Sequence, residues 1–183
     1  MMRVVLRFLN SAVTAFALLT APAAMADELD DLFERLKAPE LPEWEYVERQ
    51  IVRVLSDSGS PAMDLLLRRG RAALDADRYD EAIEHFSALI DHAPGFAEAW
   101  NARATAFFAA GQIGPALADV RKTLELEPRH FAAWQGLGIL MTEMERPDLA
   151  LRAFRQAAAI HPHRPDLKEA LERLEREVGG QDA

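Results

Sequence analysis

The sequence predicts an all-α protein, an α-solenoid of three helix-turn-helix repeats between an N-terminal helical hairpin and a C-terminal capping helix. The first observation is a constant period, because Pro94, Pro128 and Pro162 are equally spaced along the chain. The second is that apolar residues recur at the spacing of a helix face, not at the alternate spacing of a strand. The third is that these helical stretches end at proline, glycine or short polar clusters, where helices stop.

Four further positions repeat with the same period and predict how the helices pack. Small residues in the first helix of each repeat would let it approach the second closely, small residues in the second helix would answer them, and aromatic side chains would fill the space between hairpins. The four sets are Gly70, Ala104 and Gly138; Ala82, Ala116 and Ala150; Phe86, Val120 and Phe154; and Leu66, Trp100 and Trp134.

This pattern resembles the tetratricopeptide repeat family, whose signature is a 34-residue unit with W-x2-L-G-x2-Y, A-x3-F and a closing proline. Trp134-x2-Leu137-Gly138 and Ala150-x3-Phe154 carry the motif with little change, whereas Arg103 replaces its leucine in the second repeat. The resemblance implies an α-solenoid with repeats at residues 63–96, 97–130 and 131–164 and helices at 63–76, 79–92, 97–110, 115–125, 131–143 and 147–160.

The segments on either side of the repeats read as helices of a different pattern. Residues 27–62 predict a hairpin and turn, with helices over 27–38 and 43–55 and Asp27 capping the first. We expect this hairpin to cap the first repeat, because terminal repeats need a shielded face; a separate binding element is the alternative. Residues 165–183 predict a capping helix with one apolar stripe, followed by a frayed tail from Gly179.

Residues 1–26 have the three parts of a secretory signal peptide. Arg3 and Arg7 precede an apolar run, and Ala24-Met25-Ala26 forms a small-x-small site that predicts cleavage after Ala26. The apolar run from Phe8 to Leu19 is shorter than the roughly 20 residues that span a bilayer, so an uncleaved anchor is the lesser alternative. A Cys-free chain with 18 Arg and 3 Lys, built of these repeats, resembles periplasmic proteins of Gram-negative bacteria.

Composition excludes several classes of function. The absence of Cys rules out disulfides, thiolate metal sites and a Cys nucleophile. After signal cleavage 19 basic and 30 acidic residues remain, a formal net charge of −11, which opposes binding to nucleic acid or anionic lipid. The expected partner is therefore a protein or peptide, with no membrane contact after cleavage.

No catalytic or cofactor motif stands out from the repeat pattern. The sequence holds no phosphate-cradling glycine loop, nucleophile elbow or His-Glu-x-x-His helix, so we predict neither an enzyme nor a cofactor. His161 and His163, with His130 as a third member, are the best metal candidates. They occupy turns without a carboxylate at ligand spacing, so we predict no metal site.

The resemblance implies a concave groove lined by the second, fifth, ninth and twelfth positions of each repeat. We expect a non-enzymatic periplasmic adaptor or assembly factor that binds an extended partner segment there; a structural self-associating module, hence a homo-oligomer, is the alternative. Amide side chains can bond a peptide backbone, an arginine can pair with a carboxylate, and apolar side chains can form pockets. The groove residues predicted to contact the partner are Leu67, Arg71, Asn101, Thr105, Phe108, Gln135 and Ile139.

Some members of the family hold the C-termini of heat-shock chaperones in a carboxylate clamp of Lys and Asn side chains. The corresponding positions here include Leu67, Ala102, Ala132 and Gly136, and Arg71 is the one comparable polar group. These departures argue against a chaperone tail as the ligand.

Overall fold

The computed structural model describes residues 21–181, and over that range it consists of nine α-helices without a strand. No helix in the described range combines the length and the apolar character needed to cross a bilayer. The helices are α1 (Ala21–Leu36), α2 (Trp44–Leu55), α3 (Pro61–Asp75), α4 (Tyr79–His92), α5 (Ala97–Ala109), α6 (Ile113–Leu126), α7 (Phe131–Glu143), α8 (Pro147–Ile160) and α9 (Pro165–Gln181).

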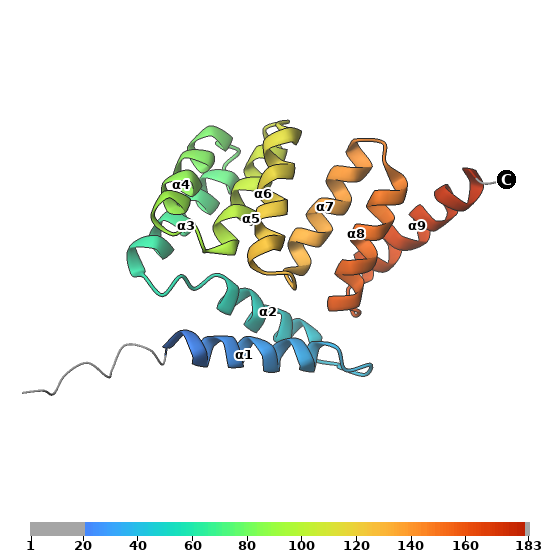
Figure 1. The fold of residues 1–183 in the computed structure, drawn as a ribbon, viewed down its shortest axis with the longest axis horizontal. Coiled ribbons are helices and arrows are strands. Elements are labelled where there is room, and N and C mark those ends of the chain that lie inside the picture. Colours follow the sequence, from blue (N-terminus) through green and yellow to red (C-terminus); the bar gives the residue numbers. More distant parts are fainter. Residues whose placement is uncertain (1–20, 182–183) are drawn as a thin grey trace, which may run out of the picture.

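Helices α3 to α8 pair as three hairpins that stand side by side in one row, and α9 follows α8 at the end of the row (Figure 1). Each hairpin packs its two helices against each other and also contacts the next hairpin through its second helix. This stacking buries two apolar clusters, one formed by α3 to α5 and one by α5 to α9. No single hairpin could bury such a surface alone. The predicted α-solenoid is confirmed.

A small residue and an aromatic ring set the spacing of the two helices in the first and third hairpins. A Cβ atom on Gly70 would overlap the ring of Phe86, and one on Gly138 would lie 2.6 Å from Cε2 of Phe154. The buried rings therefore lie directly against the backbone of the first helix. In the second hairpin the same two positions hold Ala104 and Val120. The residue on the first helix is thus larger than glycine, and the residue on the second helix is smaller than phenylalanine.

The turns inside the three hairpins share one backbone geometry. Asp77, Gly111 and Glu145, which are spaced by the same period as the prolines, all have left-handed backbone conformations, with φ of 57°, 74° and 56°. In each turn the next amide bonds back five residues, as Arg78 does to the Ala73 carbonyl at 2.9 Å. This is the Schellman termination of an α-helix, which satisfies the last free carbonyls.

The repeated tryptophans lie at the edge of the core, and the expectation that they fill it is wrong. Trp100 and Trp134 are each half-buried, while Phe86 and Phe154 are buried. Their indole N–H groups donate to the carbonyls of Pro94 at 3.0 Å and Pro128 at 2.8 Å. These bonds give the polar end of each indole a partner and tie the start of the helix to the preceding turn.

Arg103, which departs from the family motif, links three helices. Its guanidinium donates to both carboxylate oxygens of Asp119, at 2.7 and 3.0 Å, and to Ser87 Oγ at 3.0 Å. The same group lies 5.0 Å from the ring centre of Trp100. The family motif has a leucine at the position of Arg103. Here Arg103 forms a bidentate pair with the buried Asp119, so the hydrogen-bonding groups of that carboxylate are satisfied.

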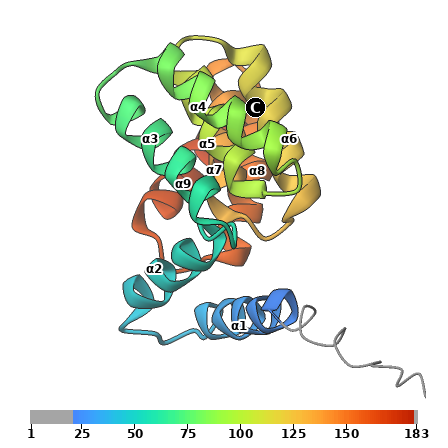
Figure 2. The same ribbon diagram turned by 90° about the vertical axis from the view of Figure 1, so that its left-hand side faces the viewer.

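The N-terminal hairpin does not cap the first repeat. Its two helices pack through Phe33 and Ile51 onto Phe131 and Ile160, which lie where the second and third repeats end or begin. Figures 1 and 2 show α1 and α2 lying beneath the row, next to the lower ends of the repeat helices. The expected position was wrong because these apolar residues at the repeat turns provide a docking surface that the start of the first repeat lacks.

Polar contacts fasten the hairpin at the same turns. Arg129 pairs with Asp30 at 2.6 Å, and Arg164 lies 3.3 Å from Glu48. The backbone carbonyl of Leu36 contacts the ring of His163 at 3.0 Å. Each contact joins residues that lie far apart in the chain.

Several helix ends differ from the prediction by one or two residues, and two differ by more. Helix α1 begins at Ala21 and passes through Asp27, because the alanine-rich segment before Asp27 favours helix and Pro22 is tolerated in the first turn. Helix α9 continues through Gly179 and Gly180 to Gln181, where fraying was expected, since no proline or cap stops it. The predicted signal peptide falls mostly on residues 1–20, outside the described residues.

The contact between Gly138 and Phe154 can be tested by reciprocal substitution. Gly138→Ala should lower the free energy of unfolding by about 1–3 kcal/mol, because the added methyl group overlaps the ring. Adding Phe154→Val should remove that penalty, so the double variant should deviate from additivity by about 1 kcal/mol or more in urea denaturation.

Gly136→Ala serves as the control, because its Cβ would meet only Val120 Cγ2, at 3.9 Å. It should be neutral or stabilising, since alanine favours helix by about 1 kcal/mol over glycine. Additive losses for Gly138→Ala and Phe154→Val would contradict the packing described above.

Candidate functional site

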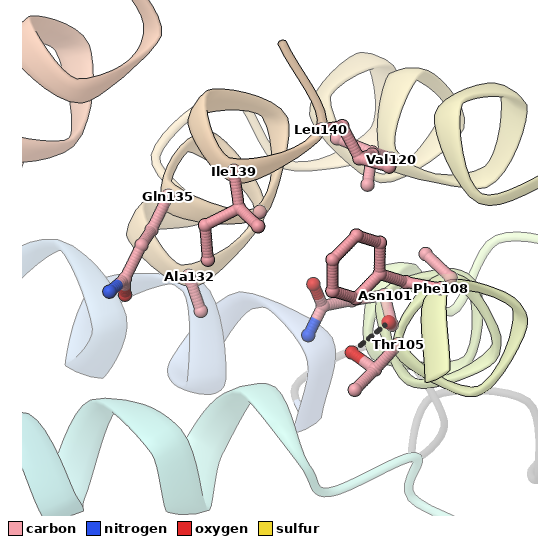
Figure 3. Close-up of a pocket in the computed structure, with 10 residues that line it drawn as sticks. Asn101, Thr105, Phe108, Val120, Ala132, Gln135, Ile139 and Leu140 are labelled. Atoms are coloured by element: carbon pink, nitrogen blue, oxygen red, sulfur yellow. Dashed lines mark hydrogen bonds between the residues drawn. The ribbon is translucent and has the colours of Figure 1, made fainter. Parts of the chain in front are cut away.

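A pocket of about 270 Å³ opens between the first helices of the second and third repeats. Phe108 of α5 and Ile139 of α7 lie on its opposite sides, and Val120 of α6 lies at its base (Figure 3). Ile139 is 41% exposed, which is unusual for so large an apolar side chain. The lining residues are Asn101, Ala104, Thr105, Phe108, Val120, Ala132, Gln135, Gly136, Ile139 and Leu140.

The pocket exists because the second repeat departs from its neighbours. Val120 stands where the other repeats have Phe86 and Phe154, so no ring fills the space above it. Gly136 adds room on the other side, because the space around its missing Cβ is open apart from Val120. The cavity is therefore a local consequence of two small side chains and not a general property of the repeat.

Polar side chains lie along one side of the pocket. Asn101 Nδ2 donates to Glu98 at 3.3 Å, and Gln135 Nε2 donates to Asp166 at 2.8 Å. Within residues 21–181, the amide oxygens of Asn101 and Gln135 have no hydrogen-bond donor. They can accept hydrogen bonds from the backbone of an extended peptide.

The structure brings five of the seven predicted groove residues together around the pocket and separates the other two. Leu67 is a correction: it is 2% exposed in the core shared by the first two repeats, so it cannot contact a partner. It is buried because Ala99 and Ala102 of the next hairpin pack into the same cluster. Arg71 lines a different hollow and is already paired. The other five are Asn101, Thr105, Phe108, Gln135 and Ile139.

Arg71 belongs to a chain of side chains that runs from the turn after α2 through the first two repeats. Its guanidinium bonds the Ser56 hydroxyl at 3.0 Å and the carboxylate of Glu98. The second oxygen of Glu98 lies 2.9 Å from Nε2 of His130. Glu98 occupies the second position of its repeat, one of the positions expected to line the groove. The sequence did not reveal the network, because its members are spread along the chain from Ser56 to His130 and share no motif.

The network fixes the protonation pattern of its buried members. His130 caps α7, and its Nδ1 accepts a hydrogen bond from the Ala133 amide at 3.2 Å, so Nε2 carries the proton that is donated to Glu98. Burial raises the pKa of the Glu98 carboxyl, but hydrogen bonds from His130 and Arg71 and the charge of Arg71 outweigh burial. The pKa of Glu98 therefore lies below its ordinary value of 4.5, and Glu98 is ionised at neutral pH.

The three candidate metal ligands serve other purposes. His130 belongs to the network, and His163 contacts the Leu36 carbonyl. The buried ring of His161 packs edge-on against Trp44 and Phe131, with centroids 5.4 and 5.1 Å away. In the described part of the chain, no three His, Cys, Asp or Glu side chains gather in a geometry that could hold a metal.

His161 also affects the ionisation of Glu48, which lies on the hairpin where it meets the repeats. Its Nε2 lies 3.4 Å from a Glu48 oxygen, an ion-pair distance that fails hydrogen-bond geometry. This contact, aided by the charge of Arg164, outweighs burial and holds the pKa of Glu48 below its usual value. Glu48 is therefore ionised where the hairpin meets the repeats.

Replacing Glu98 by Gln should lower the free energy of unfolding at pH 7 by about 2 kcal/mol, because charge-assisted hydrogen bonds are lost. The pKa of Glu98 is lower in the folded state. Its contribution is therefore full above 4.5 and is lost as pH falls through the lower folded value. The difference in free energy of unfolding between wild type and variant, measured by urea denaturation, should therefore become smaller as the pH is lowered below 4.5.

Glu84→Gln is the matched control, since Glu84 is exposed on α4. Its free energy of unfolding should match that of wild type at pH 7 and in the acidic range. A Glu98→Gln variant as stable as wild type at pH 7 would show that the network contributes nothing to folding.

Comparisons with known proteins agree with this architecture. A family model described as tetratricopeptide repeat matches residues 67–114 and 102–165. A TPR repeat-containing protein of Rhizobium etli is 29% identical over 161 residues, which cover 87% of this chain and 79% of that protein. The Hsp70-Hsp90 organizing protein of Triticum aestivum is 32% identical over 103 residues, 56% of this chain but only 18% of that protein.

Solved structures show the same fold. The Sgt2 TPR domain of Aspergillus fumigatus has a TM-score of 0.63 at 25% identity and covers 67% of this chain and 83% of that one. The first TPR of Spaghetti (RPAP3), solved with an HSP90 peptide, has a TM-score of 0.62 at 18% identity, covering 64% and 93%. Because the family model matches more than half of the sequence, the chain belongs to the tetratricopeptide repeat family.

Proposed function

We propose that this protein is a non-enzymatic periplasmic adaptor or assembly factor that holds an extended segment of a partner protein in its groove. The observation that carries the proposal is the pocket between α5 and α7, an open apolar cavity with amide groups along one side. Such a site fits an extended chain whose backbone bonds the amides and whose side chain enters the pocket.

The family supports binding and not catalysis. One structural neighbour was solved with an HSP90 peptide, so this fold can hold an extended peptide. A chaperone tail is not our choice of ligand for this chain. Arg71 is already neutralised by Glu98, Leu67 is buried, and Ala132 and Gly136 offer no side chain that could bond a carboxylate.

The periplasmic location rests on the sequence features of residues 1–26 and not on the fold. A basic start, an apolar run and a small-x-small site are the features of an exported protein. The acidic balance of the chain further favours a protein partner over nucleic acid or lipid headgroups.

Site-specific photocrosslinking tests this proposal. A photoreactive phenylalanine in place of Ile139 should crosslink, inside the periplasm, to a single stretch of a partner protein, because residue 139 is exposed at the pocket. The same probe in place of Leu126 is the control, since Leu126 is a comparably exposed apolar residue on α6, outside the pocket.

Equal labelling from both positions, or none from residue 139, would contradict the proposal. A product made of two copies of this chain, joined through residue 139, would favour the self-associating module instead. Digestion and mass spectrometry of the crosslinked product distinguish these outcomes.

A further inference from the structure

We infer that the N-terminal hairpin is the second wall of the binding groove, and that the groove takes an extended, uncharged segment with one Leu- or Phe-sized anchor side chain. This inference rests on the proposed function. It adds the surface that faces the repeats and the chemistry of the segment held between the two.

The hairpin reaches the edge of the pocket. Ala132 lines the pocket and also packs against the apolar cluster of the hairpin, beside the buried Phe131. Ala132 thus places the hairpin cluster next to the end of the pocket that lies nearest the start of α7.

A second hollow lies between α2 and α3. Its α3 side is Arg71, which bonds Glu98, and Glu98 in turn bonds Asn101 at the side of the pocket. This chain of contacts links the α3 side of the hollow to the side of the pocket, and in the proposed groove the two are neighbouring subsites. The residues of α2 and its following turn that line the hollow are Trp44, Glu45, Glu48, Arg49, Val52, Arg53 and Ser56.

Helix α2 places an exposed apolar side chain, Val52, in the lining of the hollow. Val47, Ile51 and Val54 are buried against α1 and the repeat turns. Val52 lies on the groove side, lines the hollow and is 42% exposed. In the proposed groove, Val52 is the side chain of α2 that an apolar part of the bound segment would contact.

The charges of the groove are balanced without a ligand. Arg71 pairs with Glu98, Arg53 with Glu28, and Arg164 with Glu48. The remaining two charged residues that line the hollow, Glu45 and Arg49, lie one helical turn apart with opposite signs. A strongly charged segment would gain little attraction here and would lose hydration, so an uncharged segment fits best.

The size of the pocket indicates how much of the segment enters it. Its volume of about 270 Å³ is below the range of roughly 300–1,000 Å³ of small-molecule sites. With Phe108 and Ile139 on opposite sides and Val120 below, it suits one large apolar side chain. The rest of the segment then runs past Asn101 toward α2.

A displayed library of random linear peptides, selected on the full chain, tests both parts of the inference. Enriched peptides should share one large apolar residue and lack charged residues next to it. An enriched peptide should bind Val52→Asp and Ile139→Asp at least about tenfold more weakly than wild type by fluorescence anisotropy. Tyr46→Asp should bind it normally, because Tyr46 is 50% exposed on α2 but does not line the hollow.

The failures of the two proposals are distinguishable. If Ile139→Asp weakens binding and Val52→Asp does not, the hairpin is not a wall, although the groove still binds. Enriched peptides with an acidic or basic consensus would overturn the inferred ligand chemistry. If neither substitution matters, or if no peptide is enriched by a folded protein, both the inference and the groove assignment are wrong.

Discussion

The contact between a small residue on the first helix of a hairpin and a bulky one on the second sets the geometry of this protein. Where the pair is Gly70 with Phe86, or Gly138 with Phe154, the ring lies against the opposing backbone and fills the space between the two helices. Where the pair is Ala104 with Val120, less volume is filled and a cavity remains. One exchange within a repeated packing scheme thus leaves a cavity beside the second hairpin.

The repeat period was enough to predict the solenoid, because the packing positions are local and recur once in every repeat. The ends of α4, α7 and α8 agree with their predicted ranges for the same reason. The left-handed turn residues follow that period too, but only Gly111 could be recognised from sequence. Asp77 and Glu145 adopt the same left-handed conformation, but neither residue type indicates it in the sequence.

The candidate site was only partly predictable, because repeat position does not determine exposure. Leu67 occupies the same repeat position as Asn101 and Gln135, yet neighbouring alanines bury it while the other two lie at the pocket. Arg71 was recognised as a candidate partner for a carboxylate, and that carboxylate proved to be Glu98 of the same chain. The pocket could have been noticed by comparing Val120 with Phe86 and Phe154.

The hairpin position was beyond sequence reasoning, because its contacts join distant residues. Arg129 with Asp30 and His163 with Leu36 share no spacing rule, and each becomes visible only in the folded chain. The hairpin also joins the polar network, because Ser56 at its end accepts a hydrogen bond from Arg71, which pairs with Glu98. The N-terminal segment is thus continuous with the groove in both packing and electrostatics.

The most direct measurement is the effect of exchanging Ala104 and Val120 for the Gly–Phe pair of the neighbouring hairpins. The Ala104→Gly/Val120→Phe protein should unfold in urea within about 1 kcal/mol of wild type, because it restores a packing solution that the fold already uses twice. Its ring should fill the pocket and abolish labelling from a photoreactive residue at position 139. A stable double variant that still captures the same partner segment would contradict the account, because the cavity would then have no part in binding.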